Sequence, residues 1–291
     1  MNKVKDYLQL VKLSLSIMVV FSSVMSYLLA PKVVEYEWTM IGLLFVGGLL
    51  VTGSANAINQ VVEKDTDALM KRTTKRPVAA GRMSVQEGWA FAIITGLLGV
   101  FILGYYFNWL SAGLAAFSLF LYAFIYTPLK KVSSIAVLVG AVPGALPCLI
   151  GWAAGDDQLS LGGWVLFAIQ FFWQFPHFWA IAWIAHTDYS AAGFKLLPAE
   201  KGPTKFTALQ TVIYSLLLFP VTLIPFYMGM CNYDNVGGLI SVGFIIAANS
   251  FMLMRCINLY LKMDIQSARK VMFGSYMYLP VVLLALWMSK A

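Results

Sequence analysis

The chain has 291 residues, of which 60% are hydrophobic and only 11% are charged. Soluble globular domains carry about 25% charged residues, so this composition excludes an ordinary soluble protein. Lipid is therefore expected to surround most of the chain, and the formal net charge of +7 is expected to lie on the short polar segments between apolar ones.

Nine apolar segments are long enough to cross a bilayer as helices, which takes about 20 residues each. Inside lipid, a helix satisfies all of its own backbone hydrogen bonds, and no segment shows the alternation of a strand. We predict an all-α integral membrane protein, a bundle of nine transmembrane helices that forms one membrane-embedded domain over residues 1–291. The first span is predicted to be a retained helix rather than a signal peptide. The predicted spans are 9–30, 38–60, 87–107, 109–129, 132–154, 161–186, 206–230, 235–261 and 269–290.

The basic residues are distributed unequally between the two faces of such a bundle. Of the 20 lysines and arginines, all but Lys32 and Lys290 fall on the face that holds the N-terminus. Lys and Arg concentrate in cytoplasmic loops, so this face is predicted to be cytoplasmic. Attraction to anionic lipid and binding of an anionic substrate both explain a basic face.

The three cysteines, Cys148, Cys231 and Cys256, lie in or near apolar spans, and no CxxC or Cys/His spacing occurs. We expect neither a disulfide framework nor a zinc site, and we interpret the cysteines as small packing residues.

A first polar motif follows the second span. Asn59, Glu63 and Asp67 are spaced four residues apart, which places three oxygen-bearing side chains on one helical face. Such oxygens suit a hard cation such as Mg²⁺. Arg72 and Arg76 follow, and basic groups beside a metal are what a diphosphate requires. A solvated helix end is the alternative interpretation.

A second polar motif ends the sixth span. The second and sixth spans run in the same direction, so Asp188 is expected to complete the site begun by Glu63 and Asp67. Pro176 is expected to kink the span near His177. His177 either acts on a ligand or a proton, or hydrogen-bonds a carbonyl that Pro176 leaves free.

Two further segments carry candidate residues. Tyr126 and Lys130 end the fourth span, where Lys130 is a candidate diphosphate ligand and Tyr126 a candidate stabiliser of positive charge. An interfacial anchor is the alternative for both. The glycines and prolines of residues 140–151 predict close helix contacts and a broken fifth helix.

The motifs resemble those of a known family. The run from Asn59 to Pro77, N-x-x-x-E-x-x-x-D-x-x-M-x-R-T-x-x-R-P, resembles the first signature of the UbiA superfamily of intramembrane prenyltransferases. Its tail, together with W-Q-F-P-H-F from Trp173 and D-Y-x-x-A-G from Asp188, resembles the protoheme IX farnesyltransferase branch. Many members carry aspartate where this chain has Glu63.

The resemblance implies a UbiA-type bundle that transfers the farnesyl group of farnesyl diphosphate to a vinyl group of heme b, giving heme o. It implies a Mg²⁺ cofactor, with heme b as a substrate. The implied metal ligands are Glu63, Asp67 and Asp188, the implied diphosphate ligands are Arg72, Arg76 and Lys130, and the other implied catalytic residues are Asn59, His177 and Tyr126.

The implied setting is a bacterial-type cell membrane, with the active site at the cytoplasmic face. The implied partners are membrane lipid and downstream heme-modifying or terminal-oxidase assembly proteins, with no nucleic acid. Two alternatives stay open. The first is another acceptor, such as a quinone precursor or chlorophyllide. The second is a non-catalytic transporter or heme-handling protein, which predicts carboxylates deep in several spans.

Overall fold

A computed structural model describes residues 3–199 and 202–291. Within these residues the chain is helical and forms no β-strand, and Cys231 and Lys290 form an isolated bridge. Eight helical segments are long and apolar enough to cross a membrane. The pair α1/α2, bent by 46°, is a ninth span if the two helices are counted as one. With the spans counted in this way, the prediction of a nine-helix membrane bundle is confirmed. The segments are α1 (Lys3–Leu10), α2 (Leu13–Leu29), α3 (Trp38–Val62), α5 (Val85–Tyr106), the span Trp109–Leu129, α8 (Ala136–Asp156), α9 (Leu161–Ile184), α11 (Lys205–Tyr227), α12 (Val236–Lys262) and α13 (Ile265–Met288).

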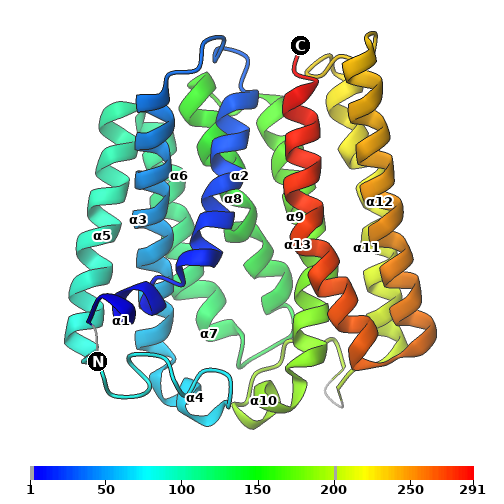
Figure 1. The fold of residues 1–291 in the computed structure, drawn as a ribbon. Coiled ribbons are helices and arrows are strands. Elements are labelled where there is room, and N and C mark those ends of the chain that lie inside the picture. Colours follow the sequence, from blue (N-terminus) through cyan, green and yellow to red (C-terminus); the bar gives the residue numbers. More distant parts are fainter. Residues whose placement is uncertain (1–2, 200–201) are drawn as a thin grey trace.

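The two ends of the bundle differ (Figure 1). Three short helices, α1, α4 (Lys64–Leu69) and α10 (His186–Ala191), lie at the end that holds the N-terminus, and the C-terminus lies at the other end. We call the first end the α4/α10 end. It carries both polar motifs, as the parallel direction of the second and sixth spans predicted. Lys201, which the sequence assigned to this face, lies outside the described residues.

Polar side chains cap the N-termini of several of the long helices. Ser84 accepts a hydrogen bond from the Glu87 N–H, and Asn108 accepts one from the Ser111 N–H. Asn235 and Asp264 do the same for α12 and α13. A side-chain oxygen at this position satisfies a backbone donor that the first helical turn leaves free.

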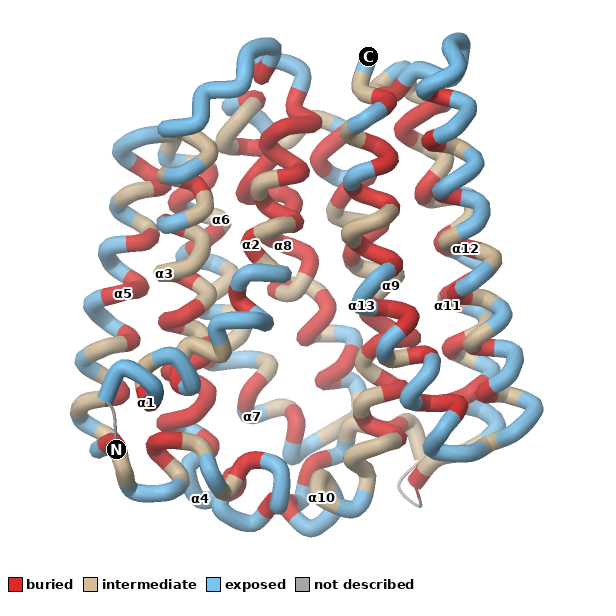
Figure 2. The backbone as a smooth tube through the Cα atoms, viewed as in Figure 1, coloured by how far each residue is buried: buried red, intermediate tan, exposed pale blue. Residues whose placement is uncertain are grey.

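The centre of the bundle is formed by α8 and α9, whose residues are mostly buried, while the outer faces of α5 and α12 are exposed (Figure 2). Helix α8 packs against α2, α6 (Trp109–Phe120) and α9. Glycines permit this close approach, because a Cβ at Gly151 would collide with the Ser23 carbonyl and one at Gly144 with the Gln174 side chain. The predicted close contacts are therefore present.

Two local features differ from the expectations. Helix α8 runs without interruption through Pro143 and Pro147, so the prediction of a broken fifth helix is wrong. Neighbouring helices surround the proline sites, and in a bundle such contacts satisfy backbone groups that proline leaves free. Helix α9 also continues as one helix through Pro176, and the kink expected near His177 stays a prediction. The fourth span, by contrast, contains a π-helical turn, η1 (Leu121–Tyr126), between α6 and α7 (Thr127–Leu129).

Substitution of Gly151 by alanine is expected to destabilise the bundle, because the added methyl group meets backbone of α2 rather than a flexible side chain. Overpacking of this kind costs about 1–3 kcal/mol or more. Thermal unfolding in detergent measures the effect. Gly113→Ala is the matched control, since a Cβ there meets nothing within 4 Å. Equal melting temperatures for the two variants would contradict the packing described.

Candidate active site

Two buried ion pairs form the centre of the α4/α10 end. Glu63 is 4% exposed and pairs with the Lys130 Nζ. Asp67 is fully buried, and the Arg76 Nη1 donates to both of its carboxylate oxygens, at 2.8 and 2.7 Å. Buried charges are costly unless they are paired, so these residues do not form the solvated helix end of the alternative interpretation.

The backbone keeps Asn59, Glu63 and Asp67 on one face although the helix is not continuous. Helix α3 ends at Val62 and α4 begins at Lys64, yet the Glu63 N–H donates to the Asn59 carbonyl and the Asp67 N–H to the Glu63 carbonyl. All three side chains are buried. The predicted spacing therefore works through two helices joined at Glu63.

Lys12 brings a further cation to the same place. Its Nζ donates to the Asn59 Oδ1 at 3.3 Å. It lies at the bend between α1 and α2 with φ of 48°, a left-handed conformation that costs about 1–3 kcal/mol in a residue other than glycine. The Asn59 Nδ2 is buried, and no described residue accepts its hydrogen bond.

Arg72 joins the second motif to the first. Its Nη2 donates to the Tyr189 hydroxyl at 3.0 Å, and its backbone N–H donates to the Asp188 carboxylate at 3.4 Å. Asp188 and Tyr189 lie on α10, which follows α9 directly. The two motifs meet as predicted, but Asp188 contacts the loop that carries Arg72.

Aromatic rings surround Lys130. Its Nζ lies 4.9 Å from the centre of the Tyr126 ring and 5.2 Å from that of Phe194. Tyr122 and Tyr126 both lie in the π-helical turn η1, with ring centres 5.3 Å apart. Single π-helical turns occur often at functional sites because they re-aim side chains.

The electrostatics of the site follow from burial. Burial raises the pKa of the Asp67 carboxyl, and the charge of Arg76 opposes this shift. Burial lowers the pKa of the Lys130 amine, and Glu63 opposes that shift. Lys12, Arg76 and Lys130 outnumber the two buried carboxylates, so the cluster has an excess of positive charge that an anionic ligand would neutralise.

The predicted metal ligands have the atoms that a hard divalent cation binds, but in this structure they are not grouped around one point. Carboxylate oxygens of Glu63, Asp67 and Asp188 are the ligands that Mg²⁺ prefers. Within residues 3–199 and 202–291, however, no three acidic, histidine or cysteine side chains are grouped as one metal site. Each carboxylate instead contacts a cationic side chain or a backbone N–H, so the predicted trio is not assembled in this arrangement.

His177 lies apart from the carboxylates. It is buried on α9 beside Trp173, with Ser275 and Tyr276 of α13 as its neighbours across the helix interface. It makes no hydrogen bond to a carbonyl near Pro176 in the described structure. His186, the second histidine, lies on α10 near Ser190, and the two histidines do not meet, as expected.

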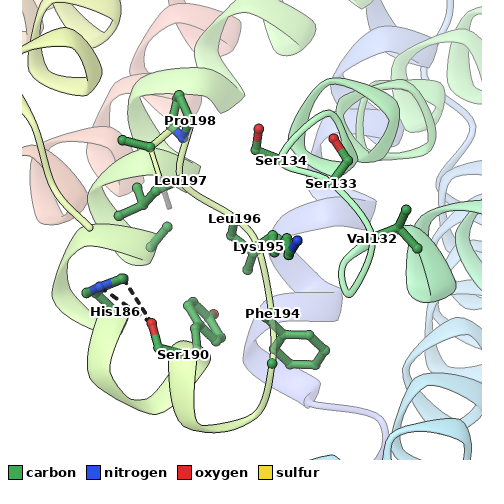
Figure 3. A pocket seen from close by; sticks show the side chains of 14 residues that line it. Val132, Ser133, Ser134, His186, Ser190, Phe194, Lys195, Leu196, Leu197 and Pro198 are labelled. Atoms are coloured by element: carbon green, nitrogen blue, oxygen red, sulfur yellow. Dashed lines mark hydrogen bonds between the residues drawn. The ribbon is translucent and has the colours of Figure 1, made fainter. Parts of the chain in front are cut away.

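A cavity of about 470 Å³ lies near the ion pairs. It is formed between the turn at residues 132–134 and the segment 186–199 (Figure 3). Tyr189 and Phe194 line it, and these two rings also contact Arg72 and Lys130. Glu63 and Asp67 do not line this cavity, so it neighbours the charged cluster without containing it.

The fold and this cluster define the class of protein. The chain belongs to the UbiA prenyltransferase family, which matches residues 19–288. Digeranylgeranylglyceryl phosphate synthase has the same fold, with a TM-score of 0.78, 18% identity and 99% of each chain covered. A UbiA homologue from Archaeoglobus fulgidus bound to GPP and Mg²⁺ gives a TM-score of 0.69 at 13% identity, over 97% of this chain and 99% of that one.

Curated relatives narrow the class. A protoheme IX farnesyltransferase of Cytophaga hutchinsonii is 41% identical over 99% of both chains. One of Rickettsia massiliae is 38% identical over 98% of this chain and 92% of that one. The family resemblance of the sequence motifs is thus confirmed along nearly the whole chain.

Sequence reasoning missed several residues of the cluster. Lys12 contributes to the basic face that predicts the topology, but a lysine inside the predicted span 9–30 also indicates a functional residue. Tyr122 is a further residue of the cluster, and its spacing of four residues from Tyr126, which places two side chains on one helical face, could have identified it. Phe194 reaches Lys130 through a contact of its loop. The Lys195 N–H donates to the Lys130 carbonyl at 2.7 Å, which holds the neighbouring Phe194 close.

Proposed function

We propose that this chain transfers the farnesyl group of farnesyl diphosphate to a vinyl carbon of heme b. The observation that carries the proposal is the buried cluster of Glu63, Asp67, Lys130 and Arg76, in a chain similar over its full length to protoheme IX farnesyltransferases. Acids and bases packed together at the end of the spans suit a metal-bound diphosphate.

The cations bind the diphosphate in this proposal. Arg72, Arg76, Lys130 and Lys12 contact its oxygens and stabilise the negative charge that develops as the carbon–oxygen bond breaks, a large term in a water-poor site. Glu63, Asp67 and Asp188 would hold Mg²⁺, which when bound neutralises diphosphate charge as a Lewis acid. The present ion pairs would open as the anion and its metal take their place.

The electron pair of the broken bond leaves with the diphosphate, and the allylic carbon becomes cationic. The Tyr126 ring faces Lys130 and lies beside the Tyr122 ring, and both rings can stabilise a cation there through their π-electrons. A vinyl carbon of the acceptor supplies the electrons of the new carbon–carbon bond. Water then captures the porphyrin-side cation and loses a proton, so the product gains farnesyl and hydroxyl groups.

His177 lies on the acceptor side of the site in this proposal, because it is buried among aromatic rings rather than beside the carboxylates. The α4/α10 end faces the cytoplasm of a bacterial-type cell, as the distribution of Lys and Arg indicates. The heme product would pass to heme-modifying or terminal-oxidase assembly proteins.

The purified chain, incubated with farnesyl diphosphate, heme b and Mg²⁺, is expected to give a heme product heavier by one farnesyl and one hydroxyl group, read by mass spectrometry. A chelator is expected to abolish turnover, and added Mg²⁺ to restore it. Conversion of a quinone precursor or chlorophyllide instead of heme would identify another acceptor. Absence of transfer to any acceptor would favour a transport or heme-handling role.

A further inference from the structure

His177 is held by an interhelical contact that the proposed reaction does not explain. Its Nδ1 lies 2.7 Å from the Ser275 Oγ of α13, and its ring stacks on Trp173 with centres 5.0 Å apart and planes 14° apart. The Trp173 Nε1 donates to the Ser275 carbonyl at 2.9 Å. Ser275 therefore contacts two side chains of α9, Trp173 and His177, which lie one helical turn apart.

The position of the serine proton decides the tautomer of His177. The Ser275 Oγ lies 2.6 Å from the Met272 carbonyl oxygen. Two oxygens this close repel unless a proton lies between them, and a carbonyl has none to give. The single hydroxyl proton must therefore point to Met272, so the Oγ is an acceptor toward the imidazole. His177 must then carry its proton on Nδ1.

A neutral imidazole with its proton on Nδ1 has a lone pair on Nε2. The described neighbours of His177 are Trp173, Phe178, Ser275 and Tyr276, none of them a carboxylate, so a charged imidazolium has no counter-ion there. No described residue hydrogen-bonds the Nε2. Its lone pair is thus left for a ligand from outside the chain.

The surroundings indicate which ligand fits. The rings of Trp173, Phe178 and Tyr276 flank the imidazole and suit a flat apolar molecule. An unprotonated imidazole nitrogen is a common ligand of iron.

We propose that Ser275 is a positioning residue that fixes the Nδ1–H tautomer of His177 and so presents the Nε2 as an axial ligand to the iron of a metalloporphyrin acceptor. The porphyrin acceptor rests on the proposed function, whereas the tautomer follows from the contacts alone. Hydrogen bonds to the second nitrogen of metal-binding histidines orient the ring and increase its basicity.

Ferric heme titrated into the full chain tests this directly, because the chain has only two histidines. The experiment requires the His186→Ala variant, purified with a tag free of histidine, so that His177 is the one imidazole in the sample. Its heme absorption and electron paramagnetic resonance spectra are expected to show imidazole ligation, which His177→Ala in the same background should lose. Unchanged spectra on removal of His177 would overturn the proposal.

The role of Ser275 has its own readout. Ser275→Ala is expected to weaken ferric heme affinity about 10-fold, as loss of such a partner does, with no change for metal-free protoporphyrin IX. Ser275→Thr keeps the hydroxyl and should retain heme affinity. Equal weakening toward both porphyrins would reveal a packing role only and refute positioning. Because these titrations need no farnesyl diphosphate, failed ligation and failed transfer are separate results.

Discussion

Asp67→Asn is expected to lower the rate of farnesyl transfer by about 100-fold or more while the chain still inserts and folds. The substitution keeps the size of the side chain but removes the charge that Arg76 contacts through both oxygens. Groups that stabilise charge in a transition state each contribute roughly 10²–10³ in rate. Initial rates from mass spectrometry, normalised to folded protein, measure the effect.

Asp65→Asn is the matched control, because it makes the same chemical change two residues away on α4, where the side chain is exposed. It is expected to keep nearly full activity. Loss of the ion pair with Arg76 should lower stability only moderately, since the Arg76 side chain is 19% exposed and can reach water. Normal turnover by Asp67→Asn would refute the assignment of Asp67 to the diphosphate site.

Lys130→Gln is expected to raise the KM for farnesyl diphosphate and to lower kcat, with a combined loss in kcat/KM of about 100-fold or more. The side chain lies between Glu63 and two aromatic rings, so its removal takes a buried cation from the place where the leaving group is proposed to bind. Steady-state kinetics at saturating heme separate the two parameters.

Lys131→Gln removes a charge from the neighbouring residue, which is exposed. It is expected to behave like the wild type, and this contrast excludes a general effect of charge at the membrane surface. Equal losses for both lysine variants would mean that position 130 acts only through the basic face as a whole.

The fold could be predicted because hydropathy and span length depend on the bilayer and not on neighbouring residues. The start of α6 at Trp109 and of α9 at Leu161 fell at the predicted residues. The helix breaks could not be predicted in the same way. Pro143 and Pro147 lie inside a continuous α8, and the π-helical turn η1 interrupts a span that reads as regular, because neighbouring helices determine both.

The sequence predicts which residues form the site, but it predicts only partly which of them pair with one another. Glu63 and Asp67 are buried on one face, as the four-residue spacing indicated. Their pairing with Lys130 and Arg76 depends on where α7 and the loop after α4 come to rest, which no local pattern encodes. The predicted role of Asp188 as a shared metal ligand stays a prediction.

One structural measurement tests the central claim most directly. A structure of the chain with Mg²⁺ and an unreactive thio analogue of farnesyl diphosphate is predicted to show the diphosphate between Arg76, Lys130 and Arg72. The metal is predicted on Glu63, Asp67 and Asp188, with the Asp67–Arg76 and Glu63–Lys130 pairs opened. An analogue bound elsewhere, with both ion pairs intact, would contradict the account.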